Sequence, residues 1–291
     1  MIIPMLTVVA CYTVCSLSDK YAVAKLKMDG NTLTWLMAAA TSLFMLAYLP
    51  FDDRHFVISV PAFAAIALMT LSKLLEFKLA AVVLVEMSAF ELKAWLGLTL
   101  FLSYITDLIS GAAPLGINTA FQFAFIGVTA AGLFLIAKTG NRINYRKIAL
   151  PLVFYLLAKY GYGLVVSFTK DCISPSFSLF WALVILAVVL APAVKPIKLF
   201  RSQTKGAAIV ALTKIPNVIG LVLENYVAEK SLANYSFIQP MILVVLFFIG
   251  LIRKEDAPRD KSTARLNLAG GIVCVAGIVG FQIIDIISKS A

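Results

Sequence analysis

The stretch from Asn234 to Ile252 reads NYSFIQPMILVVLFFIGLI and contains no charged residue. An α-helix rises about 1.5 Å per residue, so a run of this length reaches across a hydrocarbon core about 30 Å thick. Within lipid, every backbone N–H and C=O group needs a partner inside its own segment, and a helix provides one for each. The stretch therefore predicts a membrane-spanning helix.

The rest of the chain has the same character. Of its 291 residues, 61% are hydrophobic and 14% are charged, whereas soluble domains are about half apolar and a quarter charged. The apolar runs are continuous and do not alternate with period two, which disfavours a membrane β-barrel. We predict an all-α integral membrane protein, multi-pass in the cell membrane. Its ten expected helices cover approximately residues 3 to 24, 31 to 49, 57 to 76, 80 to 103, 116 to 137, 148 to 170, 174 to 194, 206 to 226, 234 to 252 and 266 to 287.

The two halves of the chain share residues at a nearly constant separation of 146 to 149 positions. The matching pairs are Pro4 with Pro151, Trp35 with Trp181, Glu76 with Glu224, Ser88 with Ser236, and Asn118 with Asn267. Such spacing indicates an internal repeat, with residues 1–140 as the first five-helix unit and 141–291 as the second. Five is an odd number, so the second unit must enter the bilayer from the opposite side. The sequence thus predicts two inverted repeats with a cavity where they meet.

This arrangement resembles the drug/metabolite transporter superfamily. The resemblance rests on ten helices as five plus five, on Lys20 in the first helix before Trp35 in the second, and on two stretches late in the chain. These are Asn234 to Ile252, which contains Pro240, and Leu268 to Gly280, which reads LAGGIVCVAGIVG. The resemblance implies a transporter of small metabolites with its site in a central cavity.

Basic residues gather on one side of the expected membrane. The linkers after the first, fifth, seventh and ninth helices, with their flanks, carry sixteen Lys and Arg residues, whereas the opposite side carries four: Arg54, Lys170, Lys230 and Lys289. The net charge of +10 therefore fits cytoplasmic loops near a lipid surface, and we expect no nucleic-acid partner. The same bias places both termini outside the cytoplasm, although the resemblance implies cytoplasmic termini.

Ionisable residues inside the apolar runs are the candidates for a functional site. A charge near the bilayer centre costs about 2.5–3.5 kcal/mol on insertion scales, so it usually faces a partner or a water-filled cavity. Glu91, Lys159 and Lys214 lie near the middle of expected helices, and Glu91 aligns with Gln239 in the second half. We expect Glu91 and Lys159 to form a pair that a zwitterionic substrate replaces, although a purely structural ion pair is the alternative.

Other candidates surround these charges. Lys214 begins the sequence KIPN, in which Pro216 frees a backbone carbonyl and Asn217 offers an amide. Tyr160 supplies a hydroxyl beside Lys159. Trp35 and Trp181 are expected either to form an aromatic wall facing the ligand or to anchor their helices at the membrane interface. Lys73, Glu76 and Glu224 fall closer to helix ends, where their charges can reach water.

These features favour a secondary transporter of a small polar or zwitterionic metabolite, amino-acid-like or amine-like, that exchanges solutes or couples their transport to protons. We find no HExxH, GxSxG or Walker A sequence and no metal-ligand spacing, so we expect neither an enzyme nor a cofactor. The expected partners are a small-molecule substrate and the lipid bilayer. The sequence does not decide whether the protein forms a homodimer. The alternatives are a flippase for a lipid-linked small group and a non-transporting membrane partner protein.

The charge bias gives a first testable prediction. A reporter that is active only in the cytoplasm should be inactive when fused after Ala291, because the positive-inside rule places this end outside. A second reporter that is active only outside the cytoplasm serves as the control for expression. Cytoplasmic activity of the first fusion would contradict the predicted orientation.

Overall fold

The computed structural model describes residues 1–26, 30–52, 55–83, 86–87, 89–137, 145–194, 196, 204–253 and 261–290. In this part of the chain every named element is a helix, and nine segments are long and apolar enough to cross a membrane. The chain is therefore an all-α, multi-pass membrane protein. Its elements are α1 (Ile2–Leu26), α2 (Gly30–Tyr48), η1 (Leu49–Phe51), α3 (Val60–Val83), α4 (Ala89–Trp95), α5 (Gly97–Ile109), α6 (Ile117–Ala137), α7 (Tyr145–Thr169), α8 (Pro175–Val194), α10 (Thr204–Leu212), α11 (Lys214–Lys230), α12 (Leu232–Arg253) and α13 (Lys261–Ser290).

Two of the nine segments contain a local interruption. The segment Glu91–Ile109 runs through α4 and α5, and Gly206–Lys230 runs through α10 and α11. At the second interruption Pro216 lacks the N–H group that would bond to the carbonyl of Leu212 one turn earlier. The apolar part of α1 is shorter, at Ile2–Ser18.

The predicted boundary between the third and fourth helices was wrong. We expected a turn near residues 77 to 79, but α3 continues to Val83 and the turn contains Glu86 and Met87. Lys73 and Glu76 lie one helical turn apart, form an ion pair of 3.2 Å, and leave the helix unbroken. Glu86, expected inside a helix, lies in the turn and pairs with Lys147 at 3.5 Å.

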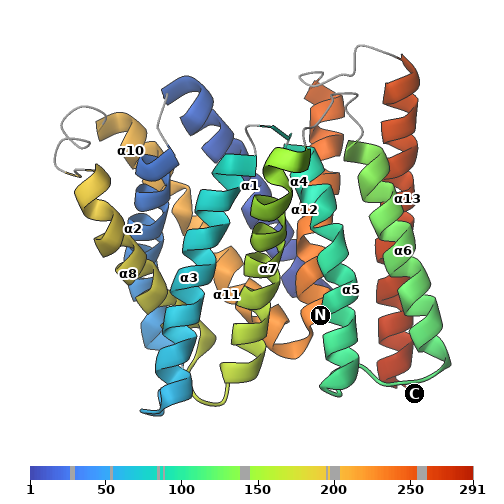
Figure 1. The fold of residues 1–291 in the computed structure, drawn as a ribbon, viewed down its shortest axis with the longest axis horizontal. Coiled ribbons are helices and arrows are strands. Elements are labelled where there is room, and N and C mark those ends of the chain that lie inside the picture. Colours follow the sequence, from blue (N-terminus) through green and yellow to red (C-terminus); the bar gives the residue numbers. More distant parts are fainter. Residues whose placement is uncertain are drawn as a thin grey trace.

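The helices form a bundle in which the most extensive contacts join elements far apart in the sequence. These pairs are α6 with α13, α3 with α7, α1 with α11, α2 with α8, α3 with α8, and α5 with α12. Figure 1 shows α6 and α13 side by side at one end of the molecule, whereas α2, α8 and α10 lie at the other end. The helices α1, α3, α7 and α11 lie between these ends and supply much of the site described below.

A buried carboxylate joins α5 to α12. Asp107, near the end of α5, accepts hydrogen bonds from the Ser231 hydroxyl at 2.7 Å and from the backbone N–H groups of Leu232 and Ala233, both at 2.9 Å. The first N–H groups of a helix have no partner within it, and the helix dipole favours a negative charge at this end. Asp107 therefore caps α12 and fixes its position beside α5.

The two termini lie toward the same side of the bundle, in the lower half of Figure 1. The helix ends that flank residues 27–29, 138–144, 197–203 and 254–260 lie in the upper half. Those basic linkers themselves, including Lys27, Lys138 and Lys254, fall outside the described residues. The described helix ends next to these linkers and the two termini therefore lie on opposite faces of the bundle, and which face is cytoplasmic stays a prediction.

The contact between α6 and α13 gives a second testable prediction. A Cβ atom added at Gly132 would lie 2.4 Å from the backbone nitrogen of Cys274, whereas one added at Gly127 on the same helix has nothing within 4 Å. Gly132→Ala should therefore separate the two helices and lower the free energy of unfolding by about 1–3 kcal/mol. Thermal unfolding of the purified protein in detergent measures this.

Gly127→Ala is the matched control and should unfold close to the temperature of the parent protein. If the two variants unfold at the same temperature, close packing of α6 against α13 at Gly132 is contradicted.

Candidate functional site

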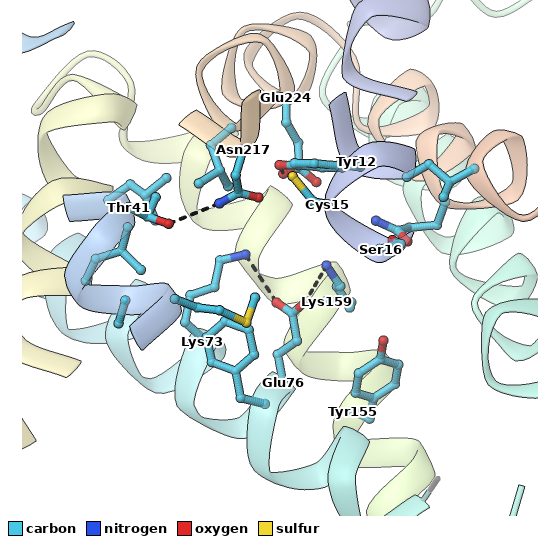
Figure 2. Close-up of a pocket in the computed structure, with 18 of the residues that line it drawn as sticks. Tyr12, Cys15, Ser16, Thr41, Lys73, Glu76, Tyr155, Lys159, Asn217 and Glu224 are labelled. Carbon is cyan, nitrogen blue, oxygen red and sulfur yellow. Dashed lines mark hydrogen bonds and ion pairs between the residues drawn. The ribbon is translucent and has the colours of Figure 1, made fainter. Parts of the chain in front are cut away.

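A cavity of about 220 Å³ lies in the middle of the bundle. Figure 2 shows its charged and polar side chains pointing toward one another from several helices. The volume is below the roughly 300–1,000 Å³ of pockets that hold drug-sized ligands, so the cavity suits a small solute. The lining residues come from α1, α2, α3, α4, α7, α8, α11 and α12.

Glu76 lies between two lysines on one side of this cavity. Its carboxylate is 2.6 Å from Lys159 Nζ on α7 and 3.2 Å from Lys73 Nζ on its own helix. The Lys73 ammonium also lies 4.3 Å from the centre of the Tyr162 ring, in cation–π geometry. Removing an ion from water costs several kcal/mol, which an ion pair offsets only with such close contacts. In the triad of Lys73, Glu76 and Lys159, the carboxylate therefore compensates the charges of two lysines.

A second carboxylate faces the cavity from α11. Glu224 is only 2% exposed, and it accepts a hydrogen bond from the hydroxyl of Tyr12 on α1. A Cβ atom added at Gly220 would lie 2.7 Å from the Tyr12 ring. The glycine therefore lets the tyrosine lie against α11, one helical turn from Glu224. The partner of this carboxylate is neutral, in contrast to the lysines around Glu76.

Two further polar contacts complete the lining. Lys93 on α4 donates a hydrogen bond to the Gln239 side-chain carbonyl on α12 at 3.2 Å. Asn217 on α11 donates to the Thr41 hydroxyl on α2 at 3.1 Å, as Figure 2 shows. Each contact joins the first half of the chain to the second, so the cavity lies where the two halves meet.

Three of the residues expected from the sequence line this cavity, namely Lys159, Asn217 and Gln239. Glu91 does not, and Lys159 pairs with Glu76 in its place. Since α3 extends to Val83, Glu91 falls in the first turn of α4. Residues two positions apart point about 200° apart around a helix, so Lys93 faces the cavity and Glu91, buried at 8% exposure, faces away. The expected pairing of Glu91 with Lys159 was wrong.

The other expected residues lie away from the cavity. Trp35 is buried between α2 and α8 and donates its indole N–H to the Ala187 carbonyl at 3.0 Å. Trp181 is 41% exposed on the outer surface. Tyr160 shares a hydrogen bond with the Thr106 hydroxyl on α5, and the buried Lys214 begins α11.

Several of the residues at the centre of the cavity were not expected there from the sequence. Lys73, Glu76 and Glu224 were assigned to helix ends, yet all three line the cavity. The signal that could have identified them was the repeat match between Glu76 and Glu224, together with the spacing of Lys73 and Glu76. Tyr12 gave no signal, because a tyrosine within an apolar helix has no feature that distinguishes it from a packing residue.

A second cavity, of about 320 Å³, lies where α2, α7 and α11 end and α8 begins. Glu224 lines the first cavity and its neighbour Asn225 lines the second. The Asn225 side-chain carbonyl accepts a hydrogen bond of 2.6 Å from the buried Tyr162 hydroxyl. The two cavities are therefore lined by neighbouring residues of α11. The charged and imidazole groups that line the second one are Asp52, His55, Lys170 and Glu229.

Comparison with known proteins finds no family model and no curated protein that matches this chain. The resemblance to the drug/metabolite transporter superfamily therefore stays a prediction from the sequence. Any account of the function has to come from the geometry of the cavity.

The two carboxylates give a third testable prediction. Glu76→Gln should lower the free energy of unfolding by about 3–5 kcal/mol, because two buried lysines lose their shared counter-charge. Glu224→Gln should change it by about 1 kcal/mol, because the amide carbonyl can still accept the Tyr12 hydrogen bond. Thermal unfolding of both variants in the same detergent measures the difference.

These substitutions are a matched pair, since each replaces a buried glutamate by its amide in the same cavity. A loss in Glu224→Gln as large as that in Glu76→Gln would contradict the unequal charge compensation.

Proposed function

We propose that this protein is a secondary transporter that moves a small polar or zwitterionic metabolite across the cell membrane by alternating access. The observation that carries the proposal is a central cavity lined by buried charges of both signs. Ionisable groups at membrane depth are costly, and they occur where a solute or ion passes. The sequence contains no nucleotide-binding motif, so the proposed flux draws on the gradient of a solute or of protons.

Two inverted five-helix repeats, and ten spans with α1 as the first, are part of this proposal. The supporting observation is that Lys159 follows Tyr12 by 147 residues and Glu224 follows Glu76 by 148. The proposed repeat therefore relates Lys159 to Tyr12 and Glu224 to Glu76. The contact of Lys159 with Glu76 then corresponds to the contact of Tyr12 with Glu224. The helix contacts α3 with α7 and α11 with α1 correspond in the same way. A two-fold relation between halves accounts for both matches.

The second cavity supports alternating access. A transporter built on this plan needs one aqueous region on each side of its site, with a thin barrier that opens on one side at a time. Glu224 and Asn225, neighbours on α11, line the first and the second cavity, and the buried Tyr162 donates its hydroxyl to Asn225. In the proposed cycle, rearrangement of Tyr162 and Asn225 opens a path between the cavities.

Flux of a solute tests the proposal directly. Proteoliposomes that contain only this protein should take up labelled metabolites in a saturable manner. Asn217→Trp should reduce uptake by at least about tenfold, because the indole ring fills the cavity that Asn217 lines. Ile219→Trp is the matched control on the same helix, since Ile219 is 49% exposed on the outer surface and this variant should retain uptake.

Each alternative function predicts a different result. A non-transporting partner protein gives no flux of any solute, and a flippase moves only lipid-linked probes. Equal uptake by the two tryptophan variants, with both proteins folded, would show that the solute does not pass through this cavity.

A further inference from the structure

We propose that Lys93 and Gln239 form a subsite for a carboxylate group, and that the transported solute is a small carboxylate with a net charge of −1. The inference rests on the proposed transport function and adds the chemical class of the substrate. It is carried by the charge balance of the cavity and by the hydrogen bonds that its lining residues leave unused.

The described residues that line the cavity carry unequal numbers of charges. They include three lysines, at positions 73, 93 and 159, and two glutamates, at positions 76 and 224. The formal charge of the lining is therefore +1. An uncompensated charge in a low-dielectric interior is costly, and a ligand with one negative charge removes that cost. A neutral zwitterion leaves the excess charge in place, and a cation increases it.

The excess charge can be assigned to one lysine. Lys73 and Lys159 share Glu76, and Lys159 also lies within electrostatic range of Glu224. The formal charges of these two lysines and two glutamates therefore sum to zero. Among the described residues, the hydrogen bond that Lys93 makes is to the neutral Gln239 carbonyl at 3.2 Å. At longer range it faces Lys159 and Glu76, whose charges oppose each other.

The orientation of Gln239 prepares the subsite for an anion. A lysine ammonium can only donate hydrogen bonds, so the amide oxygen of Gln239 must face it. The Gln239 amide nitrogen is then left as a donor, and the ammonium keeps two further N–H groups. A carboxylate has two acceptor oxygens and can bind both donors at once. Charge-assisted hydrogen bonds of this kind are about twice as strong as neutral ones.

The cavity can also accommodate a solute amino group, and this does not alter the conclusion that the solute carries a net charge of −1. Glu224 has the neutral Tyr12 hydroxyl as its hydrogen-bond partner, so a solute ammonium can approach this carboxylate. An acidic amino acid, with two carboxylates and one ammonium, has the required net charge of −1. A simple monocarboxylate has it too, and both belong to the proposed class.

Thermal stabilisation by solutes tests the inference on the purified full chain. Solutes are offered as acids paired with their own amides, including L-glutamate with L-glutamine and succinamate with succinamide, alongside a panel of amines and sugars. A ligand that binds the folded state raises the apparent melting temperature, and the rise increases with the logarithm of its concentration relative to its Kd. The monoanion of a pair should stabilise the parent protein more than its amide does.

Substitutions at position 93 connect this preference to the subsite. Lys93→Gln should weaken binding of the monoanion by roughly 10- to 100-fold, as expected when a charged hydrogen-bond donor is lost, and should reduce the preference over the amide. Lys93→Arg keeps the charge and should restore most of the affinity. Lys147→Gln is the control, because this exposed lysine pairs with Glu86 outside the cavity.

The outcomes separate this inference from the proposed function. Stabilisation by neutral or cationic solutes in preference to anions would overturn the inference and leave transport intact. Unchanged anion affinity in folded Lys93→Gln would do the same. If no solute of any charge stabilises the parent protein, and none is taken up by proteoliposomes, the transport proposal itself fails. Should Lys93→Gln not fold, Gln239→Met removes the amide donor and must weaken anion binding for the inference to stand.

Discussion

The contact of Glu76 with Lys73 and Lys159 is the constraint on which the rest of the site depends. The Glu76 carboxylate has two positive partners, and α7 supplies the nearer one, at 2.6 Å, from a position remote in sequence. The ion pair therefore fixes how deep α7 lies along α3, which is one of the most extensive helix contacts in the bundle. Because two lysines meet one glutamate, the triad keeps a positive charge that the rest of the cavity has to accommodate.

Under the proposed repeat, the position equivalent to Glu76 has a different partner. Tyr12 would correspond to Lys159, and it hydrogen-bonds to Glu224, which the spacing relates to Glu76. A fold built from two related halves can therefore hold one strongly compensated carboxylate and one with a neutral partner. In the proposed transporter, Glu224 is the carboxylate that a solute amino group can approach, because its hydrogen-bond partner is neutral.

Close contacts join helices that are far apart in the sequence. The contact of α6 with α13 depends on close approach at Gly132, and Asp107 fixes the start of α12 with three hydrogen bonds. The buried Tyr162 donates its hydroxyl to Asn225, which lines the second cavity, and its ring lies against Lys73. In the proposed transport cycle these contacts rearrange when the two cavities connect, while the close contacts elsewhere hold their helices together.

The sequence by itself determined the fold class and most helix limits, because about 20 apolar residues in lipid leave the backbone few alternatives to a helix. It also identified Lys159, Asn217 and Gln239 as candidates, and it related Glu76 to Glu224 through their spacing. Only the tertiary structure decided that Lys159 pairs with Glu76 and that Glu91 faces away from the cavity. Partner choice depends on which faces of separate helices meet, and hydropathy carries no information about that rotation. Lys73 and Glu224 were assigned to helix ends for another reason: the predicted helices ended at residues 76 and 226, whereas α3 continues to Val83 and α11 to Lys230.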